Sequence, residues 1–178
     1  MKIRVADLDF ELLIDSDRIS ARVKEIAEQI DNDYRERTPI VLGVLNGSFL
    51  FTADLLREIR IPIEVAFTKL ASYFGGTSTT RTIRDDFGIA AELKGRDIIV
   101  VEDIVDTGNT LHYLVNKLRT RQPASIVACS LLLKPEALER PVDELKYVGF
   151  EIENEFVVGY GLDYKEQGRN LKDIFRKV

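Results

Sequence analysis

The sequence of 178 residues contains one cysteine, has no long hydrophobic run and shows no cluster of basic residues. Because Cys129 is the only cysteine, an internal disulfide bond is excluded. No apolar run approaches the length of a membrane span, and the amino terminus lacks the hydrophobic segment of a signal peptide. A net charge of -5 with scattered Lys and Arg argues against non-specific binding of nucleic acid. We therefore expect a cytoplasmic protein with no membrane and no nucleic acid as partner.

The composition is that of an ordinary globular protein, with 45% hydrophobic and 31% charged residues. The length suits one domain that can bury a full core, so we expect residues 1–178 to form a single domain. Cys129 lies in an apolar run and is interpreted as a core residue rather than a nucleophile. His112, the only histidine, is interpreted as a surface or interface residue rather than a catalytic group.

The most informative stretch runs from Asp97 to Leu118. It begins with the β-branched run 98–101, which is typical of a strand buried on both faces of a parallel sheet. Glu102, Asp103 and Asp106 follow at the carboxyl end of this strand, the edge where open α/β sheets bind their ligands. Carboxylates suit sugar hydroxyls, Mg²⁺ or a proton in transfer.

A polar turn connects this strand to a helix, and it consists of Thr107, Gly108, Asn109 and Thr110. The helix has one apolar face, formed by Leu111, Leu114, Val115 and Leu118. A helix amino terminus offers free N–H groups, and glycine lets the backbone approach closely, so this turn could wrap a phosphate. Together with the acids it predicts a ligand that carries both a phosphate and a polyol, such as a phosphorylated sugar. The alternative is a set of solvated acids beside an ordinary helix cap.

A second strand and turn precede this stretch. The apolar run 40–45 predicts a buried strand, and the turn Asn46-Gly47-Ser48 follows it. We expect a helix next, with Phe49, Ala53 and Leu56 on its apolar face. The backbone donors of the turn could meet an anion, although composition alone favours a plain turn.

A third strand follows the central helix. The run Ser125–Leu133 completes a right-handed βαβ unit that begins at residue 97, which indicates a parallel sheet. The strand ends at Lys134, at the same edge as the acids. From the residues alone, Lys134 is as well explained as an ordinary charge at a strand end.

The other segments carry less chemistry. We expect an edge strand or extended arm over 1–14, a helix from Ser16 capped by Asp15 or Ser16, and strands over 62–70 and 156–160. The segment 71–81 is rich in Gly, Ser and Thr and predicts either a mobile loop with glycine hinges or an exposed hairpin tip. A strand and a turn are expected over 81–93. Phe156, taken alone, is more typical of a core residue than of a ligand contact.

The central motif, V-V-E-D-I-V-D-T-G-N-T-L, resembles the phosphoribosyl-diphosphate (PRPP) signature of the type I phosphoribosyltransferases. Its core, E-D-I-V-D-T-G, resembles the form found in the purine salvage branch of that family. Members of this branch include the hypoxanthine-type enzymes. The resemblance runs from about Gly43 to Arg169, with four motifs in the order of the family. It implies an α/β fold in which a mostly parallel, twisted sheet is flanked by helices, with a small hood formed by the terminal segments. It also implies a homodimer or a homotetramer.

The activity implied by this resemblance is transfer of 5-phosphoribosyl from PRPP to N9 of hypoxanthine or guanine, giving IMP or GMP and pyrophosphate, with Mg²⁺ as cofactor. The turn 107–110 then holds the 5′-phosphate. Glu102 and Asp103 grip the ribose hydroxyls, directly or through metal. Asp106 lies between the phosphate and the base, and is the general base or hydrogen-bond partner at the purine N7 proton.

The resemblance also implies a loop for pyrophosphate at Leu45, Asn46 and Gly47, with a non-proline cis peptide that would fall at Leu45–Asn46. Lysine is common in the family where this chain has Asn46, so a side-chain cation from this loop is not implied. Ser72 and Tyr73, followed by S-T-T-R, resemble the start of a flexible lid that closes over PRPP.

The purine half of the implied site comes from the last third of the chain. Lys134, which has only donors, suits the O6 carbonyl of a 6-oxopurine base rather than the amine of adenine. The segment F-V-V-G-Y-G-L-D-Y matches a motif in which Phe156 stacks on the purine, Val157 offers backbone groups to its edge, and Asp163 holds Mg²⁺. Arg169 contacts pyrophosphate. The tail after Arg169 departs from the commoner family ending, and the preference among hypoxanthine, guanine and xanthine is not readable from spacing.

Two other functions share some of these sequence features. A regulator with the same fold that binds RNA and senses nucleotide would need an exposed basic face, which a pI near 5.1 argues against. A phosphoacceptor receiver domain also has acids at strand ends and a late lysine. That interpretation leaves the turn 107–110 and the segment 156–160 without a role.

Overall fold

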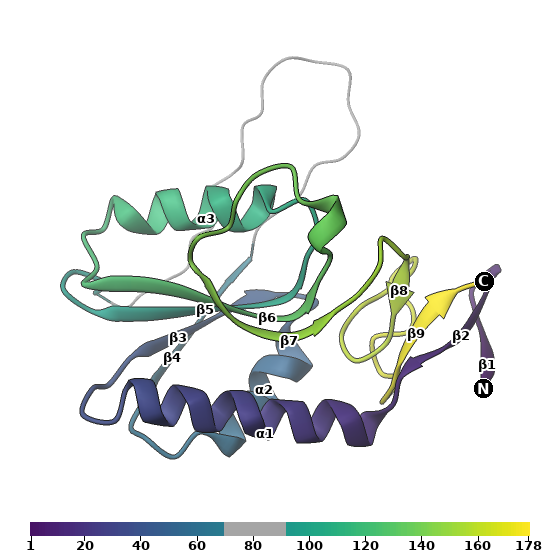
Figure 1. The fold of residues 1–178 in the computed structure, drawn as a ribbon, viewed down its shortest axis with the longest axis horizontal. Coiled ribbons are helices and arrows are strands. Elements are labelled where there is room, and N and C mark those ends of the chain that lie inside the picture. Colours follow the sequence, from purple (N-terminus) through teal and green to yellow (C-terminus); the bar gives the residue numbers. More distant parts are fainter. Residues whose placement is uncertain (70–91) are drawn as a thin grey trace.

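The computed structural model describes residues 1–69 and 92–178 and is organised around a parallel sheet of five strands in the order β4-β3-β5-β6-β7 (Figure 1). All its strand pairs are parallel. The strands are β3 (Ile40–Leu45), β4 (Glu64–Lys69), β5 (Asp97–Val105), β6 (Ser125–Leu133) and β7 (Leu145–Glu151). Helices α1 (Ser16–Asp33) and α2 (Phe49–Glu58) cover one face of the sheet, and α3 (Asn109–Arg119) covers the other (Figure 1). The expected helix-flanked parallel sheet is confirmed.

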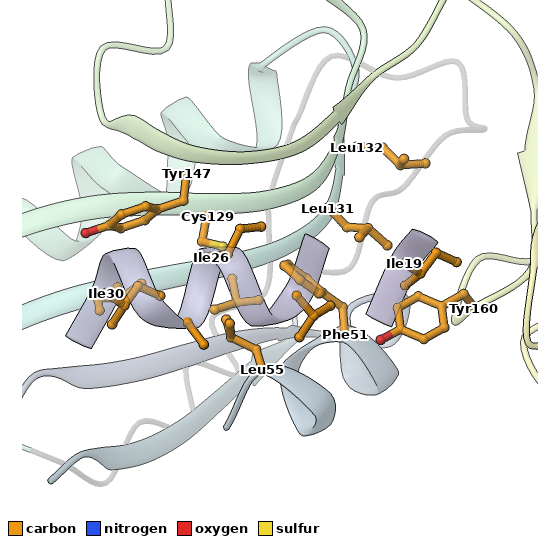
Figure 2. Packing of buried hydrophobic residues seen from close by; sticks show 14 of the residues in the cluster. Ile19, Ile26, Ile30, Phe51, Leu55, Cys129, Leu131, Leu132, Tyr147 and Tyr160 are labelled. Carbon is orange, nitrogen blue, oxygen red and sulfur yellow. The ribbon is translucent and has the colours of Figure 1, made fainter. Parts of the chain in front are cut away.

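The centre of the sheet is fully buried, as the β-branched run in β5 predicts. The four residues 98–101 are all 0% exposed, and they have helices on both sides. The apolar face expected for α1 is confirmed by five buried residues, namely Ile19, Val23, Ile26, Ala27 and Ile30. Figure 2 shows the isoleucines of this helix packed against α2 and the sheet, with Cys129 beside Ile26. Burying each such side chain contributes about 1.5–3 kcal/mol.

The buried face of α2 differs from the expectation. Phe51, Thr52 and Leu55 are buried, whereas Phe49 is 39% exposed and Ala53 is also exposed. Both sets of residues have helical spacing, so periodicity alone cannot choose between them. The buried Ser48 hydroxyl donates to the Val44 carbonyl oxygen at 2.6 Å and so holds the turn before the helix against the end of β3.

The terminal segments form a separate antiparallel sheet of four strands in the order β1-β2-β9-β8. Its strands are β1 (Lys2–Val5), β2 (Leu8–Ile14), β8 (Val157–Val158) and β9 (Ile174–Lys177). The edge strand or arm expected over 1–14 is thus a hairpin. The strand expected over 156–160 is shorter, because Gly159, Tyr160 and Gly161 have left-handed backbone conformations that end it. We call this sheet the hood; it lies beside the end of the main sheet where β5 leads into α3 (Figure 1).

The remaining strands agree only in part with the sequence-based expectations. The strand over 62–70 is observed as β4, and its last expected residue lies outside the described residues. Most of the strand and turn expected over 81–93 also lies outside them. β7, which pairs with β6 at the edge of the sheet, was not expected from the sequence. Within the described ranges, no helix is long and apolar enough to cross a membrane.

Candidate active site

The three acids after the central strand have different environments. β5 continues to Val105, so Glu102 and Asp103 belong to the strand while Asp106 lies beyond it. Consecutive strand residues point to opposite faces, so Glu102 and Asp103 do not share one surface. Glu102 is only 5% exposed, and its Oε1 atom has no hydrogen-bond partner within the described ranges. Burial, reinforced by the charge of Asp103, raises the pKa of Glu102 well above its usual range.

Asp103 faces the loop that follows β3. Its Oδ1 atom accepts a hydrogen bond from the Ile104 amide at 2.9 Å. A Cβ atom placed on Gly47 would lie 1.6 Å from Asp103 Oδ2, so only glycine allows this approach. The Leu45–Asn46 peptide bond in the same loop is cis, as the resemblance implied. Burial raises the pKa of Asp103 to about 6, while the charge of Arg169 opposes that rise.

The turn before α3 has the form expected of an anion site. Gly108 has a φ of 79° and precedes the first helical residue, Asn109. The N-cap residue Gly108 has no side chain that could cap the helix, and the Thr107 hydroxyl accepts from the Asn109 amide at 3.3 Å, so the next amides of the first turn remain as donors for a phosphate. The turn is held from outside by Glu139, whose amide donates to the Thr107 carbonyl oxygen at 3.1 Å and whose Oε2 accepts from Asn109 Nδ2 at 2.7 Å. His112 is exposed on α3, which confirms its interpretation as a surface residue.

Lys134 and Asp106 meet at the carboxyl edge of the sheet. The Lys134 Nζ atom lies 3.1 Å from Asp106 Oδ2. The pairing of β5 with β6 places Val105 opposite Leu133, so the two residues that follow are neighbours. Sequence reasoning put both at this edge, and the structure brings them into one ion pair.

The hood supplies an aromatic surface. Phe156 directly precedes β8 and is 46% exposed, although phenylalanine is more often buried. Its ring centroid lies 6.3 Å from that of Phe10, and its ring makes an edge contact with Tyr164 at 5.7 Å. The next residue, Val157, pairs with β9 in β8, which is the edge strand of the hood. One ring face and one strand edge are therefore available to a planar ligand.

Asp163 and Arg169 form a second ion pair. Arg169 Nη2 lies 2.7 Å from Asp163 Oδ1, and Arg169 Nη1 donates to the Gly161 carbonyl oxygen at 2.9 Å. The other Asp163 oxygen accepts from the Glu166 amide at 2.9 Å. The charge of Asp163 raises the pKa of Asp103 and that of Arg169 lowers it, so the pair lies within electrostatic reach of β5.

A metal ion has carboxylates to bind in this region, but no complete protein cage. Among the described residues, no group of three or more His, Cys, Asp or Glu side chains could hold a metal by itself. Mg²⁺ is usually held by one or two carboxylates together with substrate phosphates, and Asp103 and Asp163 offer such oxygens. The donor set therefore fits a metal that arrives with a phosphorylated substrate.

Two of the predicted site residues lie outside the part of the chain that the structure describes. Two residues at the site were not predicted from the sequence. Ser72 and Tyr73 lie outside the described residues. The missed residues are Gly161, which lies against the Gly47 carbonyl group, and Tyr160, whose hydroxyl donates to Asp54 of α2. The sequence G-Y-G at 159–161 signals a tight turn, because glycine readily adopts positive φ.

Comparisons with known proteins agree with this geometry. The family model described as "Phosphoribosyl transferase domain" matches residues 13–165. A hypoxanthine-guanine phosphoribosyltransferase from Mycobacterium tuberculosis is 43% identical over 169 residues, covering 92% of this chain and 83% of that protein. A hypoxanthine phosphoribosyltransferase from Haemophilus influenzae is 42% identical over 171 residues, covering 94% and 95%. A crystal structure of a hypoxanthine-guanine phosphoribosyltransferase from Bacillus anthracis superposes with a TM-score of 0.87 at 39% identity, covering 94% of this chain and 98% of that one.

Proposed function

The chain belongs to the phosphoribosyltransferase family, and from that premise we propose that it transfers the 5-phosphoribosyl group of PRPP to N9 of hypoxanthine or guanine. The products are IMP or GMP and pyrophosphate, so the reaction is one of purine salvage. One arrangement carries the proposal: the Lys134–Asp106 pair stands at the same sheet edge as the turn 107–110. A cation and an acid therefore lie beside the turn that is proposed to bind the phosphate, and this neighbourhood supports the proposal.

The proposed position of PRPP follows the carboxyl edge of β5. The 5′-phosphate binds the amino terminus of α3, where Gly108 allows the backbone to approach. Asp103 accepts hydrogen bonds from the ribose hydroxyls or holds Mg²⁺ there. Glu102 contacts the ribose as well, which requires its buried carboxyl group to turn toward the ligand.

The base is proposed to lie between the hood and the end of β6. Lys134 donates to O6, Phe156 stacks on one face of the ring, and Val157 offers its backbone groups to the ring edge. N9 attacks C1′ as the bond from C1′ to the pyrophosphate oxygen breaks, and the N7 proton passes to the Asp106 carboxylate. General-base help of this kind contributes roughly 10²–10⁴ in rate.

The leaving pyrophosphate is proposed to bind opposite the base. Arg169 and the backbone of Leu45, Asn46 and Gly47 offer donors there, and Asp163 and Asp103 are the carboxylates that would hold Mg²⁺. The metal supplies positive charge that stabilises the departing pyrophosphate. Ser72 and Tyr73 are proposed to begin the lid over PRPP, although they lie outside the described residues.

We propose that residues 1–178 act as one domain, that the protein works as a homodimer or a homotetramer, and that it is cytoplasmic. The relatives described above are named as enzymes, so the alternative of an RNA-binding regulator has no support. The match of the family model over residues 13–165 likewise leaves no support for a receiver domain.

Initial-rate assays with PRPP, MgCl₂ and each of adenine, hypoxanthine, guanine and xanthine test the proposed function. We expect nucleotide formation with hypoxanthine, guanine or both, and little with adenine, because adenine presents an amine to Lys134 in place of a carbonyl oxygen. Adenine as the best substrate would overturn the role given to Lys134. No nucleotide from any base would reject the proposed function itself.

A further inference from the structure

We propose that Tyr160 is a positioning residue for the pyrophosphate half of the site. This proposal rests on the proposed function. Tyr160 connects the turn 159–161, which follows β8, to α2. Through this turn it keeps Arg169 close to the loop 45–48. The sequence alone gave Tyr160 no role. Three sets of contacts support this positioning role.

The first contact joins the hood to α2. The Tyr160 hydroxyl donates to Asp54 Oδ2 at 2.7 Å, and the two residues are 106 positions apart in the sequence. The Tyr160 side chain is buried, with 7% of the residue exposed, and it belongs to the same buried cluster as Phe51 of α2 (Figure 2). Burial and the bond to Asp54 both raise the pKa of the hydroxyl, so it stays protonated and remains a donor at neutral pH.

The second contact places the turn directly on the pyrophosphate loop. A Cβ atom on Gly161 would lie 2.1 Å from the Gly47 carbonyl oxygen, so no side chain fits between the two segments. Gly159, Tyr160 and Gly161 all have positive φ values, of 105°, 48° and 100°. A tyrosine in this left-handed conformation is sterically unfavourable, and the bond to Asp54 compensates by fixing its side chain.

The third set of contacts carries the effect to Arg169. Arg169 Nη1 donates to the Gly161 carbonyl oxygen, and the Gly161 amide donates to the Arg169 carbonyl oxygen, both at 2.9 Å. The guanidinium group is thus held by the residue that follows Tyr160. If the turn moves away from α2, Arg169 moves away from the loop 45–48 with it.

The chain offers a matched control for the tyrosine hydroxyl. Tyr147 is 2% exposed, and its hydroxyl donates to Asp33 Oδ2 at 2.6 Å, also on a helix. Tyr147 lies in β7 near its amino end, and Asp33 is the last residue of α1, so neither belongs to the proposed site. Tyr147→Phe and Tyr160→Phe therefore remove the same kind of bond from comparably buried tyrosines.

The experiment measures the affinity of each variant for pyrophosphate with MgCl₂ by calorimetry, and the KM values for PRPP and for hypoxanthine. For Tyr160→Phe we expect the pyrophosphate dissociation constant and the PRPP KM to rise by roughly 3- to 10-fold, because one buried hydrogen bond is lost. The hypoxanthine KM should change less than about twofold. Tyr147→Phe should lower the melting temperature without changing any of the three constants.

Substitutions at Asp54 provide an independent route if Tyr160→Phe fails to fold. Asp54→Asn keeps an acceptor oxygen and should behave nearly as the unaltered protein, whereas Asp54→Leu should reproduce the loss of pyrophosphate and PRPP affinity. Folded Tyr160→Phe and Asp54→Leu proteins with unchanged constants would overturn the inference. An unaltered protein that forms no nucleotide would instead reject the proposed function, so the two failures are distinguishable.

Discussion

The ammonium group of Lys134 and the carboxylate of Asp106 form an ion pair in which the two partners differ in exposure. The Lys134 side chain is 9% exposed and the Asp106 side chain 49%, with 3.1 Å between Nζ and Oδ2. A buried ammonium group needs a partner, because desolvation is costly. If a bound base separates the two groups, a 6-oxopurine can replace the contact that each of them loses, because it offers a carbonyl oxygen to Lys134 and an N–H to Asp106. Adenine cannot do so at its C6 amine.

Replacing Lys134 should therefore weaken use of the base more than use of PRPP. For Lys134→Met we expect kcat/KM for hypoxanthine to fall by roughly 10- to 150-fold, since a hydrogen bond from a charged donor contributes about 1.5–3 kcal/mol. Lys146→Met is the control, because Lys146 pairs with Asp33 at 2.8 Å on an exposed surface. Steady-state kinetics with each substrate varied in turn would measure both, and an equal fall in the two variants would contradict the prediction.

Replacing Asp106 should affect turnover. Asp106→Asn keeps the size of the side chain but cannot accept the N7 proton, so kcat should drop by roughly 10²–10⁴ while PRPP affinity is kept. Asp97→Asn, at the opposite end of β5, is the matched control and should keep its kcat. Unchanged turnover in Asp106→Asn would remove Asp106 from the role of general base.

The contact between Gly47 and Asp103 should tolerate no side chain. In Gly47→Ala the new Cβ would overlap Asp103 Oδ2, so the loop 45–48 or the carboxylate must move. We expect kcat/KM for PRPP to fall by at least about tenfold, as small displacements of binding groups are costly. Gly95→Ala is the comparison, because its Cβ meets no atom within 4 Å and only its φ of 70° is strained. That variant should lose roughly 1–2 kcal/mol of stability and keep its kinetics.

The raised pKa of Asp103 predicts a pH-dependent gain in stability for Asp103→Asn in metal-free protein. Burial raises this pKa from 3.8 to about 6, so between these values the unfolded state ionises while the native state still holds its proton. The unaltered protein therefore loses stability as pH rises from 4 to 6, and carries the full cost above pH 6. The amide does not titrate, so Asp103→Asn should be more stable than the unaltered protein at pH 8, by up to about 3 kcal/mol, and by much less at pH 4.

Urea unfolding at pH 4, 6 and 8 would measure this effect, and Asp7→Asn supplies a control of opposite sign. A hydrogen bond from Lys165, at 2.7 Å, lowers the pKa of Asp7. The stability that Asp7 contributes is present above its unfolded pKa and is lost as pH falls through the lower folded value. Asp7→Asn should thus be destabilised at pH 8 and approach the unaltered protein in acid. A gain for Asp103→Asn that did not vary with pH would contradict the assignment.

The sequence predicted best the elements that show one clear pattern of apolar residues. The run 98–101 could only be a doubly buried strand, and Leu111, Leu114, Val115 and Leu118 could only be one helix face; all eight residues are buried. β7 was missed because it mixes buried Tyr147 with exposed Lys146 and Glu151, as an edge strand does. The predicted buried face of α2 was wrong because two interleaved sets of residues both had helical spacing.

The relationships within the site were harder to predict than its members. The Lys134–Asp106 pair follows from strand register, which places 105 opposite 133, so counting residues back from the ends of both strands could have found it. The bond from Tyr160 to Asp54 joins residues 106 positions apart through a turn with three left-handed residues. Neither hydrophobic periodicity nor composition encodes such a meeting of hood and helix. The separate environments of Glu102 and Asp103 also needed the structure, because the strand runs further than the β-branched residues indicate.

The strand order of the hood has a consequence for how the site assembles during synthesis. β8 ends some sixteen residues before β9 begins. Among the described strands β8 pairs only with β9, and β9 joins β8 to the amino-terminal hairpin. A nascent chain that has not yet emerged through Lys177 already contains β3, β5, β6 and the turn 107–110. It does not yet contain the strand that pairs with Val157, so we expect the proposed purine half of the site to be completed last. A stop codon just before Ile174 would remove β9. The shortened chain should keep the residues proposed to bind PRPP, but Phe156 and Val157 would lack the strand that pairs with them.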